Sequence, residues 1–290
     1  MGHKVYLNGK FIDRNKAKLS IFDHGLLYGD GVFEGIRSYH RLVFKLNEHI
    51  DRLYKSADAI ELKIPMAKRV LVKAVRDTLK RNKLDNAYIR LVVTRGPGDL
   101  GLDPRKCKAG GFIFIITDKI TLYPKKFYEK GLHIVSVKTR KNYKGAIDPN
   151  IKSLNYLNNI LAKIEAIKKA SPEAIMLTHD DYVAECTSDN IFIVKGNTLL
   201  TPPRDISLKG ITQNAVIDIA RKSKIRFKEK NMKLNEIYKA DECFLTGTAA
   251  EIVPVTRVDS HVIGAGKPGP VTCELMAAFR ELTKVDGVRY

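Results

Sequence analysis

The chain has 290 residues, of which 44% are hydrophobic, and this length favours two domains with a core in each. Its net charge is +19, from 51 basic and 32 acidic residues that are spread along the whole chain. So basic a balance raises nucleic acid or acidic small molecules as partners. However, the short lysine and arginine clusters are interrupted and no aromatic RNA-binding motif joins them, which argues against specific nucleic-acid binding.

Membrane and metal sites are not indicated either. The sequence has no run of about 18 apolar residues, and residues 1–10 lack the apolar stretch of a signal peptide, so we expect a cytoplasmic protein without membrane contact. The four cysteines are widely spaced and form neither a CxxC pair nor a metal-ligand pattern. We therefore expect reduced thiols and no metal site.

The N-terminal segments predict a hairpin followed by a glycine-rich stretch. Asn8-Gly9 between two short apolar runs is typical of a type I′ turn. Residues 20–39 then alternate four glycines with aromatic residues that include Tyr28 and Phe33, a pattern poor for a helix. Glycines let a backbone approach a ligand and aromatic rings can wall a pocket, although a tight packing corner is the alternative.

Two amphipathic helices and a strand follow. The apolar spacing predicts helices over residues 48–62 and 70–82. Arg52 lies beside the apolar stripe of the first, where a guanidinium would suit an anion; a surface salt bridge is the alternative. The strand Ala87–Thr94 places Tyr88 and Arg90 on one face, which suits a carboxylate clamp, although half-exposed sheets show the same pairing.

The domain boundary is expected after the buried strand Gly111–Thr117. Residues 119–128 carry Pro124 and mixed polar residues, so they are predicted as a linker between a domain of residues 1–118 and one of residues 129–290. The second domain is expected to open with the strand Leu132–Lys138.

Lys152 precedes the most periodic segment of the chain. Apolar residues recur at three- and four-residue steps from Leu154 to Ile167, which predicts a helix with one buried face. A lysine just before that helix lies beside the positive end of its dipole, which favours a neutral, accessible amine. Such an amine can form a Schiff base; a solvated lysine is the alternative.

Short strands follow, predicted at Ala174–Leu177, Tyr182–Glu185, Ile191–Lys195 and Thr198–Thr201. Glu185 closes the second of them. A carboxylate there could pair with the ring nitrogen of a cofactor, because a permanently charged pyridinium needs an acidic partner. A strand-end glutamate in water is the alternative.

Two later segments are candidate anion cradles. Residues 208–212 precede a helix predicted over residues 213–223, so their amides lie at a helix N-terminus, where phosphate binds well. Residues 246–250 join the predicted strands 242–245 and 251–255 and offer amides and hydroxyls on small residues. An ordinary helix cap and an ordinary turn are the alternatives.

Together these segments resemble the class IV, or fold-type IV, aminotransferases that use pyridoxal 5′-phosphate, and in particular the branched-chain amino acid aminotransferases. The resemblance covers nearly the whole chain. Its motifs, in order, are YLNGKF, FDHGLLYGDGVFEGIR, EHIDRLYKSA, AYIRLVVTRG, IKSLNYLNN, AECTSDNIF, LKGIT and TGTAAEIVPV. It implies an α+β chain with the D-amino acid aminotransferase-like fold and the cofactor between two domains.

The resemblance also implies roles for residues. Lys152 would form the Schiff base and act as the catalytic residue. Glu185 would contact the ring nitrogen, Leu208 a ring face and Tyr156 the phenolic oxygen. The implied phosphate contacts are Arg52, Thr248 and the two residues that follow Gly210, namely Ile211 and Thr212. The implied substrate contacts are Tyr28 and Phe33 around the side chain, Tyr88, Thr248 and Ala249 at the α-carboxylate, and Arg90 at the distal carboxylate of glutamate.

The implied reaction is transamination between leucine, isoleucine or valine and 2-oxoglutarate, with ping-pong kinetics and Lys152 moving the α-proton. One pocket must then accept both an aliphatic side chain and a carboxylate, which aromatic walls with Arg90 at the margin can do. Sites of this family borrow a loop from a neighbouring subunit, so we expect a homodimer or larger assembly, with Gly98–Arg105 as the loop.

Three alternatives stay open. The short interval between Lys152 and Tyr156 matches the D-amino acid aminotransferases of the same fold, whereas Arg90 in its YIR context favours the L-branched-chain enzymes. An aminodeoxychorismate lyase would share the cofactor residues and differ at Tyr88 and Arg90. From another class, a basic nucleic-acid-binding protein would bind oligonucleotides with strong salt dependence and hold no chromophore.

Overall fold

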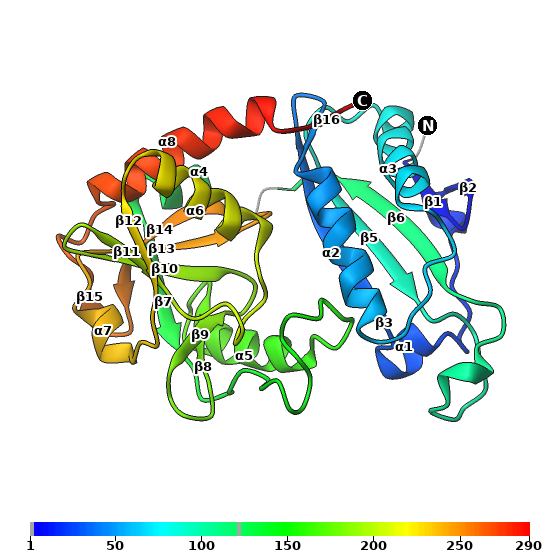
Figure 1. Ribbon diagram of the computed structural model, residues 1–290, viewed down its shortest axis with the longest axis horizontal. Helices are drawn as coiled ribbons and strands as arrows, with labels where there is room; N and C mark the ends of the chain where they lie inside the picture. Colours follow the sequence, from blue (N-terminus) through cyan, green and yellow to red (C-terminus); the bar gives the residue numbers. More distant parts are fainter. Residues whose placement is uncertain (1–2, 121–122) are drawn as a thin grey trace. The chain divides into compact units, whose positions relative to one another are not determined.

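The computed structural model describes residues 3–120 and 123–290, which form two compact units (Figure 1). The first unit extends to residue 120 and also contains residues 151–155 and 283–290, and the other described residues form the second. The segment of Lys152 and the C-terminus therefore group with the first unit, unlike in the predicted division. Residues 121 and 122 of the predicted linker lie outside the described residues, and its last part begins helix α4 (Lys125–Lys130).

The first unit is built on a seven-stranded sheet in which every pair of neighbouring strands is antiparallel. Its strand order is β16-β4-β3-β5-β6-β1-β2. The strands are β1 (Lys4–Leu7), β2 (Lys10–Asp13), β3 (Gly31–Tyr39), β4 (Leu42–Phe44), β5 (Ala87–Thr94), β6 (Phe112–Asp118) and β16 (Gly287–Arg289).

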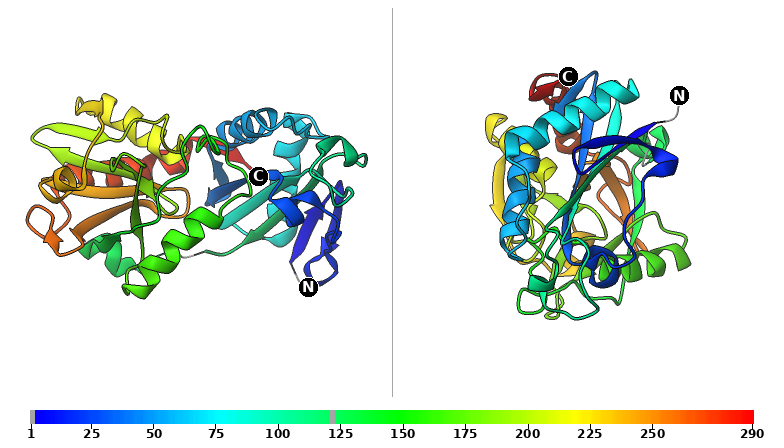
Figure 2. Two further views of the ribbon diagram at one scale, coloured as in Figure 1. Left: turned by 90° about the horizontal axis from the view of Figure 1, so that it is seen from below. Right: turned by 90° about the vertical axis from the view of Figure 1, so that its right-hand side faces the viewer.

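Two helices, α2 (Leu46–Asp58) and α3 (Lys68–Asn82), cover one face of this sheet (Figures 1 and 2). Helix α2 buries Ile50, Leu53 and Ala57 at three- and four-residue steps, and these side chains join the core that the sheet supplies. Both helices and strand β5 confirm the sequence predictions. The unit also contains 3-10 helices at Arg14–Lys16 and Pro104–Lys106.

The first turns of the chain are partly as predicted. Asn8 and Gly9 both have positive φ angles, 41° and 89°, as the predicted type I′ turn requires. In contrast, the glycine-rich stretch that was predicted to be poor for a helix contains α1 (His24–Tyr28). The Asp23 carboxylate accepts a hydrogen bond from the Gly25 amide at 2.8 Å and so caps this helix.

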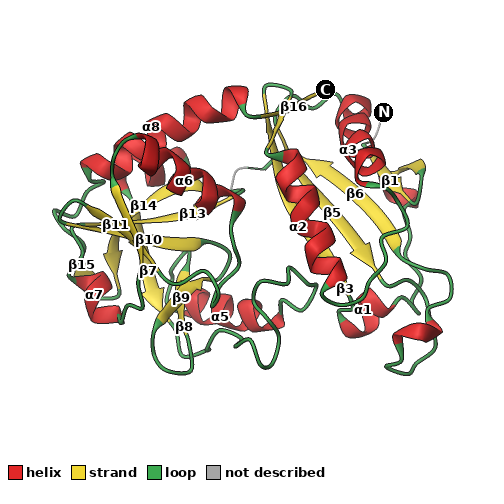
Figure 3. Ribbon diagram, in the orientation of Figure 1, coloured by secondary structure: helices red, strands yellow, loops and turns green. Residues whose placement is uncertain are grey.

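The second unit contains a nine-stranded sheet in the order β12-β11-β10-β13-β14-β7-β8-β9, with β15 paired to β14 (Figure 3). Together with its helices it confirms the predicted α+β class. The strands are β7 (Leu132–Ser136), β8 (Ala174–Leu177), β9 (Val183–Cys186), β10 (Asn190–Lys195), β11 (Thr198–Thr201), β12 (Arg226–Glu229), β13 (Glu242–Gly247), β14 (Glu251–Val258) and β15 (His261–Val262).

The helices that begin in this unit are α4, α5 (Leu157–Lys168), α6 (Ile211–Lys222), α7 (Leu234–Tyr238) and α8 (Pro270–Val285). Helix α8 was not predicted, although Leu275 and Phe279 are spaced for one helix face and both are buried. The buried Glu242 carboxylate caps it by accepting hydrogen bonds from the amides of Val271 and Thr272 at 3.0 and 2.7 Å. None of the helices in the described ranges combines the length and apolar character that a membrane crossing needs.

The predicted buried face of α5 is wrong. Leu157 is 68% exposed and Ile167 is 63% exposed, and the apolar residues between them on that stripe are exposed too. The face that packs on β7 and β8 contains Ala162 and Ala166, whose small side chains fit close against the sheet. The apolar periodicity therefore gave the helix but not its buried side.

This orientation of α5 predicts effects of different size for two substitutions. Ala162→Leu is expected to lower the free energy of unfolding by about 1–3 kcal/mol, because it overpacks the core. Leu157→Gln changes an exposed side chain and should alter the free energy of unfolding by less than about 0.5 kcal/mol. Urea unfolding of both variants beside the wild type checks this, and a larger loss for Leu157→Gln would show that the helix packs in the other orientation.

Candidate functional site

The backbone of Lys152 is held against the start of β3. The Phe33 amide donates to the Lys152 carbonyl at 3.0 Å and the Leu154 amide donates to the Gly31 carbonyl at 2.9 Å. Strand β4 pairs only with the last two residues of β3, so the first residues of β3 have an unpaired edge that residues 151–155 fill. The Lys152 amide also donates to the Ser56 hydroxyl on α2 at 3.1 Å.

The Lys152 amine lies in an environment that disfavours its charge. Its Nζ is 4.6 Å from the centroid of the Phe33 ring. Burial, and after it the Arg52 guanidinium, lower the pKa of Lys152 to about 8, while Glu34 and Tyr88 act in the opposite direction. The predicted helix start at Leu154 is wrong, because α5 begins at Leu157. Loss of water and a neighbouring cation therefore lower this pKa, in place of the predicted helix dipole.

Arg52 is held by a buried carboxylate. Glu34 of β3 accepts hydrogen bonds from two nitrogens of Arg52 at 2.7 and 2.8 Å, and His49 Nδ1 lies 2.7 Å from the same carboxylate. Burial alone would raise the pKa of Glu34, but the charges of Arg52 and His49 and their hydrogen bonds hold it at about 2. Burial lowers the pKa of His49 despite the adjacent Glu34. The predicted inward position of Arg52 is confirmed.

Tyr88 and Arg90 lie side by side on β5, as the alternation predicts. An Arg90 guanidinium nitrogen donates to the Tyr88 hydroxyl at 3.2 Å, and Arg90 Cζ is 4.6 Å from the centroid of Phe33. A side chain at Gly35, on the neighbouring strand β3, would overlap the Tyr88 hydroxyl. The glycine is therefore required for the phenol to cross β3 at this point. Both Tyr88 and Arg90 act on the charge of Lys152, so the structure brings these predicted residues together.

Tyr28, the remaining predicted substrate residue of the first unit, anchors the loop Gly98–Arg105. Its hydroxyl donates to the Leu100 carbonyl at 2.5 Å, and His24 Nε2 lies 2.8 Å from the Asp99 carbonyl. Two side chains of α1 thus contact neighbouring carbonyls of the loop, those of Asp99 and Leu100. The place of Tyr28 in a substrate pocket stays a prediction.

In the second unit, Glu185 lies near the end of β9 and is buried, so the alternative of a strand-end glutamate in water is wrong. Its Oε1 is 2.5 Å from Lys141 Nζ, and its Oε2 accepts a hydrogen bond from Asn190 Nδ2 at 3.3 Å. The same Asn190 nitrogen donates to the Leu208 carbonyl at 2.9 Å. Asn190 therefore links two of the residues that the resemblance assigns to the cofactor.

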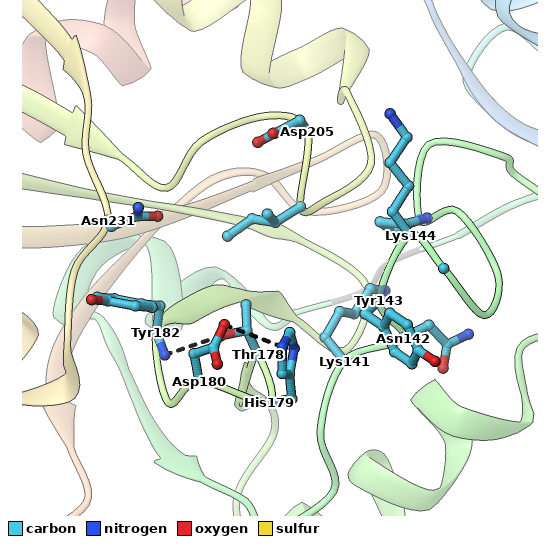
Figure 4. A pocket seen from close by; sticks show the side chains of 13 residues that line it. Lys141, Asn142, Tyr143, Lys144, Thr178, His179, Asp180, Tyr182, Asp205 and Asn231 are labelled. Atoms are coloured by element: carbon cyan, nitrogen blue, oxygen red, sulfur yellow. Dashed lines mark hydrogen bonds and ion pairs between the residues drawn. The ribbon is translucent and has the colours of Figure 1, made fainter.

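Lys141 also lines a cavity of about 350 Å³ that lies within the second unit. Figure 4 shows Lys141, Asn142 and Tyr143 on one side of this cavity and Tyr182 and Asn231 on the other. The lysine thus stands between the Glu185 carboxylate and an open space.

The two predicted anion cradles have different geometries. Helix α6 begins at Ile211, and its N-cap residue Gly210 has no side chain that could cap the first amides, so the amides of Ile211 and Thr212 can bind an anion. Asn190 Oδ1 occupies the space that a side chain at Gly210 would need. Thr248 and Ala249 are half-buried in the turn between β13 and β14.

Tyr156 is half-buried and directly precedes α5, and its predicted contact with the cofactor oxygen stays a prediction. Sequence reasoning missed Glu34, His49 and Lys141. Glu34 left a signal, because it is an acid between Val32 and Ile36 on the buried face of an apolar strand. Lys141 left none, because it is one basic residue in a basic segment.

Comparison with known proteins agrees with the resemblance. Residues 31–258 match the family described as amino-transferase class IV. The chain is 49% identical, over 99% of its length and 98% of the relative, to a Methanocaldococcus jannaschii protein provisionally named a branched-chain-amino-acid aminotransferase. It is 35% identical to the D-alanine aminotransferase of Listeria monocytogenes serotype 1/2a, over 98% of each.

A solved structure agrees too. The branched-chain amino acid aminotransferase of Escherichia coli has a TM-score of 0.94 to this chain at 32% identity, covering 98% of this chain and 95% of that chain. The fold is therefore the one that the resemblance implies.

The buried Glu34 carboxylate predicts a specific dependence of stability on pH. Its pKa in the folded protein is lowered from 4.5 to about 2, so it contributes about 3 kcal/mol above pH 4.5, and this is lost as the pH falls toward 2. Glu34→Gln should remove that contribution and its pH dependence, while Glu48→Gln, at an exposed site of α2, should keep both. Urea unfolding between pH 3 and 7 measures this. Identical pH profiles for the wild type and Glu34→Gln would contradict the assignment.

Proposed function

This chain belongs to the class IV aminotransferase family, whose members use pyridoxal 5′-phosphate, and on that premise we propose that it transfers amino groups between branched-chain L-amino acids and 2-oxoglutarate. The observation that carries the proposal is the Lys152 amine, which has a lowered pKa beside Phe33, Arg52, Tyr88 and Arg90. Roughly a tenth of an amine with a pKa of about 8 is neutral at pH 7, far more than for an ordinary lysine.

The residues present fit this cofactor. An amine of lowered pKa suits an aldehyde, uncapped helix amides with a guanidinium suit a phosphate, and a buried carboxylate suits a ring nitrogen. We assign these roles to Lys152, to the α6 amides with Arg52, and to Glu185. Of the other cofactor contacts implied by the resemblance, Thr248 completes the phosphate site, Leu208 packs on the ring and Tyr156 donates to the phenolic oxygen.

When bound, pyridoxal phosphate supplies an aldehyde that condenses with amines and a ring that withdraws electrons from the substrate's α-carbon. Lys152 Nζ would take the proton from the substrate's α-carbon and pass it to the carbon of the cofactor's former aldehyde group, so that the amino group can leave with the cofactor. Glu185 keeps the proton on the ring nitrogen, and Arg52 holds the phosphate. Glu34 fixes Arg52 by accepting its hydrogen bonds, and His49 contacts the same Glu34 carboxylate.

The substrate proposal rests on Phe33, Tyr88 and Arg90 beside Lys152, together with the other contacts that the resemblance implies. Phe33 and Tyr28 offer aromatic walls for an aliphatic side chain, and Arg90 offers a guanidinium for the second carboxylate of glutamate or 2-oxoglutarate. Tyr88, Thr248 and Ala249 are assigned to the α-carboxylate. The similarity to a D-alanine aminotransferase keeps D-amino acids as the alternative substrates.

We also propose a homodimer or larger assembly to which the loop Gly98–Arg105 contributes. Leu100 and Leu102 of this loop are 71% and 79% exposed, and Ile21 and Phe22 nearby in the same unit are exposed as well. Exposed apolar side chains in such number support burial against another surface. A second copy of the chain is the partner that the resemblance implies.

We further propose a cytoplasmic location. All four cysteines are free, and Cys107, Cys186 and Cys243 are buried. Free thiols suit a reducing compartment. Fractionation of cells that express the protein from its own promoter would place it.

The substrate proposal predicts a ranking of amino donors. With 2-oxoglutarate as acceptor, L-leucine, L-isoleucine and L-valine should react at least about tenfold faster than D-alanine, and Lys152→Ala should abolish turnover with all of them. The matched control Lys168→Ala changes an exposed lysine of α5 and should retain full activity. Chromatography measures glutamate formation in the transamination reactions and the consumption of aminodeoxychorismate in a separate assay. Preference for D-alanine, or activity on aminodeoxychorismate alone, would overturn the substrate assignment.

The assembly proposal predicts that charge on the loop separates the subunits. A variant with both Leu100→Asp and Leu102→Asp should have a lower molar mass in solution than the wild type, because carboxylates would be buried without partners. Val262→Asp is the control, since it charges an exposed apolar residue of β15. Light scattering coupled to size-exclusion chromatography gives the masses. An unchanged oligomer in the loop variant would exclude this loop from the interface.

A further inference from the structure

The ion pair between Lys141 and Glu185 is more buried than a surface pair. The lysine side chain is 9% exposed and the glutamate side chain 7% exposed, with their charged atoms 2.5 Å apart. Removing two charges from water costs several kcal/mol per ion, so such a pair is weak evidence for a role in stability alone. In this ion pair Lys141 contacts Glu185, the carboxylate that the proposed function assigns to the cofactor's ring nitrogen.

Both partners are fixed by hydrogen bonds within the second unit. The Lys141 amide donates to the Leu177 carbonyl at the end of β8 at 2.8 Å, which sets where the lysine leaves the backbone. On the other side of the carboxylate, Asn190 donates to Glu185 and to the Leu208 carbonyl. Glu185 is therefore held from two directions, by a cation on one oxygen and by an amide on the other.

Other carboxyl groups are buried close to Glu185. Burial raises the pKa of Asp189, and the charges of Glu173 and Glu185 raise it further, while Lys163 acts in the opposite direction. Glu185 thus belongs to a group of buried carboxylates that influence one another. Lys141 is the cation in direct contact with the Glu185 carboxylate.

We propose that Lys141 is a positioning residue for Glu185. Lys141 holds the Glu185 carboxylate in place and limits how strongly that carboxylate stabilises the proton on the nitrogen of the cofactor ring. This inference rests on the proposed function, because that function pairs Glu185 with the ring nitrogen. A carboxylate that already contacts one cation attracts a second cation less, since the two positive charges repel each other. Lys141 therefore sets how readily the ring nitrogen loses its proton during the reaction.

Two substitutions separate charge from packing. Lys141→Met removes the charge and keeps a long unbranched side chain, whereas Lys141→Arg keeps the charge. The cavity of about 350 Å³ beside Lys141 gives the larger guanidinium room. In Lys141→Met without cofactor, Glu185 has lost its cation, so the thermal midpoint should fall. Loading with pyridoxal phosphate restores a cation, so the midpoint should then rise more than in the wild type.

Titration of the ring nitrogen gives a readout that a merely structural role would not change. With ¹⁵N-labelled pyridoxal phosphate bound, the ¹⁵N chemical shift reports protonation of that nitrogen at each pH. In Lys141→Met the nitrogen should keep its proton to a pH at least about one unit higher than in the wild type, and the apparent Kd for the cofactor should fall about tenfold. Lys141→Arg should behave like the wild type in both measurements.

The outcomes are distinct. The inference is overturned if Lys141→Met leaves the nitrogen titration and the rise on loading unchanged. If that variant does not fold, the variant with both Lys141→Met and Glu185→Gln decides: its folding supports the pairing, and its failure shows that Lys141 acts through other contacts. A wild-type protein that binds no pyridoxal phosphate would instead contradict the proposed function.

Discussion

The backbone hydrogen bonds between residues 151–155 and the start of β3 are the constraint on which the site depends. They fix Lys152 on the first unit, so the position of its amine beside Phe33 does not rely on a flexible loop. Fixing the amine there has a cost. Lowering a lysine pKa from 10.5 to about 8 corresponds to about 3 kcal/mol of unfavourable interaction for the charged form. The protein therefore holds a less stable charged amine at the point where a neutral amine is useful.

Each unit places a cation against a buried carboxylate. In the first, Glu34 orients Arg52 through two hydrogen bonds and keeps its own charge because the Arg52 cation compensates it and His49 forms a further hydrogen bond to it. In the second, Lys141 and Asn190 hold Glu185. One member of each pair, Arg52 or Glu185, has an assigned cofactor role. Its partner, Glu34 or Lys141, has no such role and holds it in place. This arrangement keeps charged groups in defined positions without requiring them to face water.

The sequence predicted the local elements well and their surroundings less well. Strand β5 and helices α2 and α3 follow from periodicity, because their buried faces are long and regular. Helix α5 has the same kind of signal but packs through Ala162 and Ala166, and periodicity cannot tell a stripe that faces the core from one that faces outward. The partners of Arg52 and Glu185 depend on contacts between distant segments, such as Lys141 with Glu185, and local patterns do not encode those. The motifs that carry the resemblance identified candidate residues whose neighbours only the fold could supply.

We propose that the Lys152 amine bonds covalently to the aldehyde of pyridoxal phosphate. The most direct test is to load the protein, reduce it with borohydride and locate the added mass by peptide mass spectrometry. We expect a single phosphopyridoxyl group per chain, on the peptide that contains Lys152. A modified protein whose Lys152 is unlabelled while other lysines carry the group, or one that takes up no group at all, would contradict it.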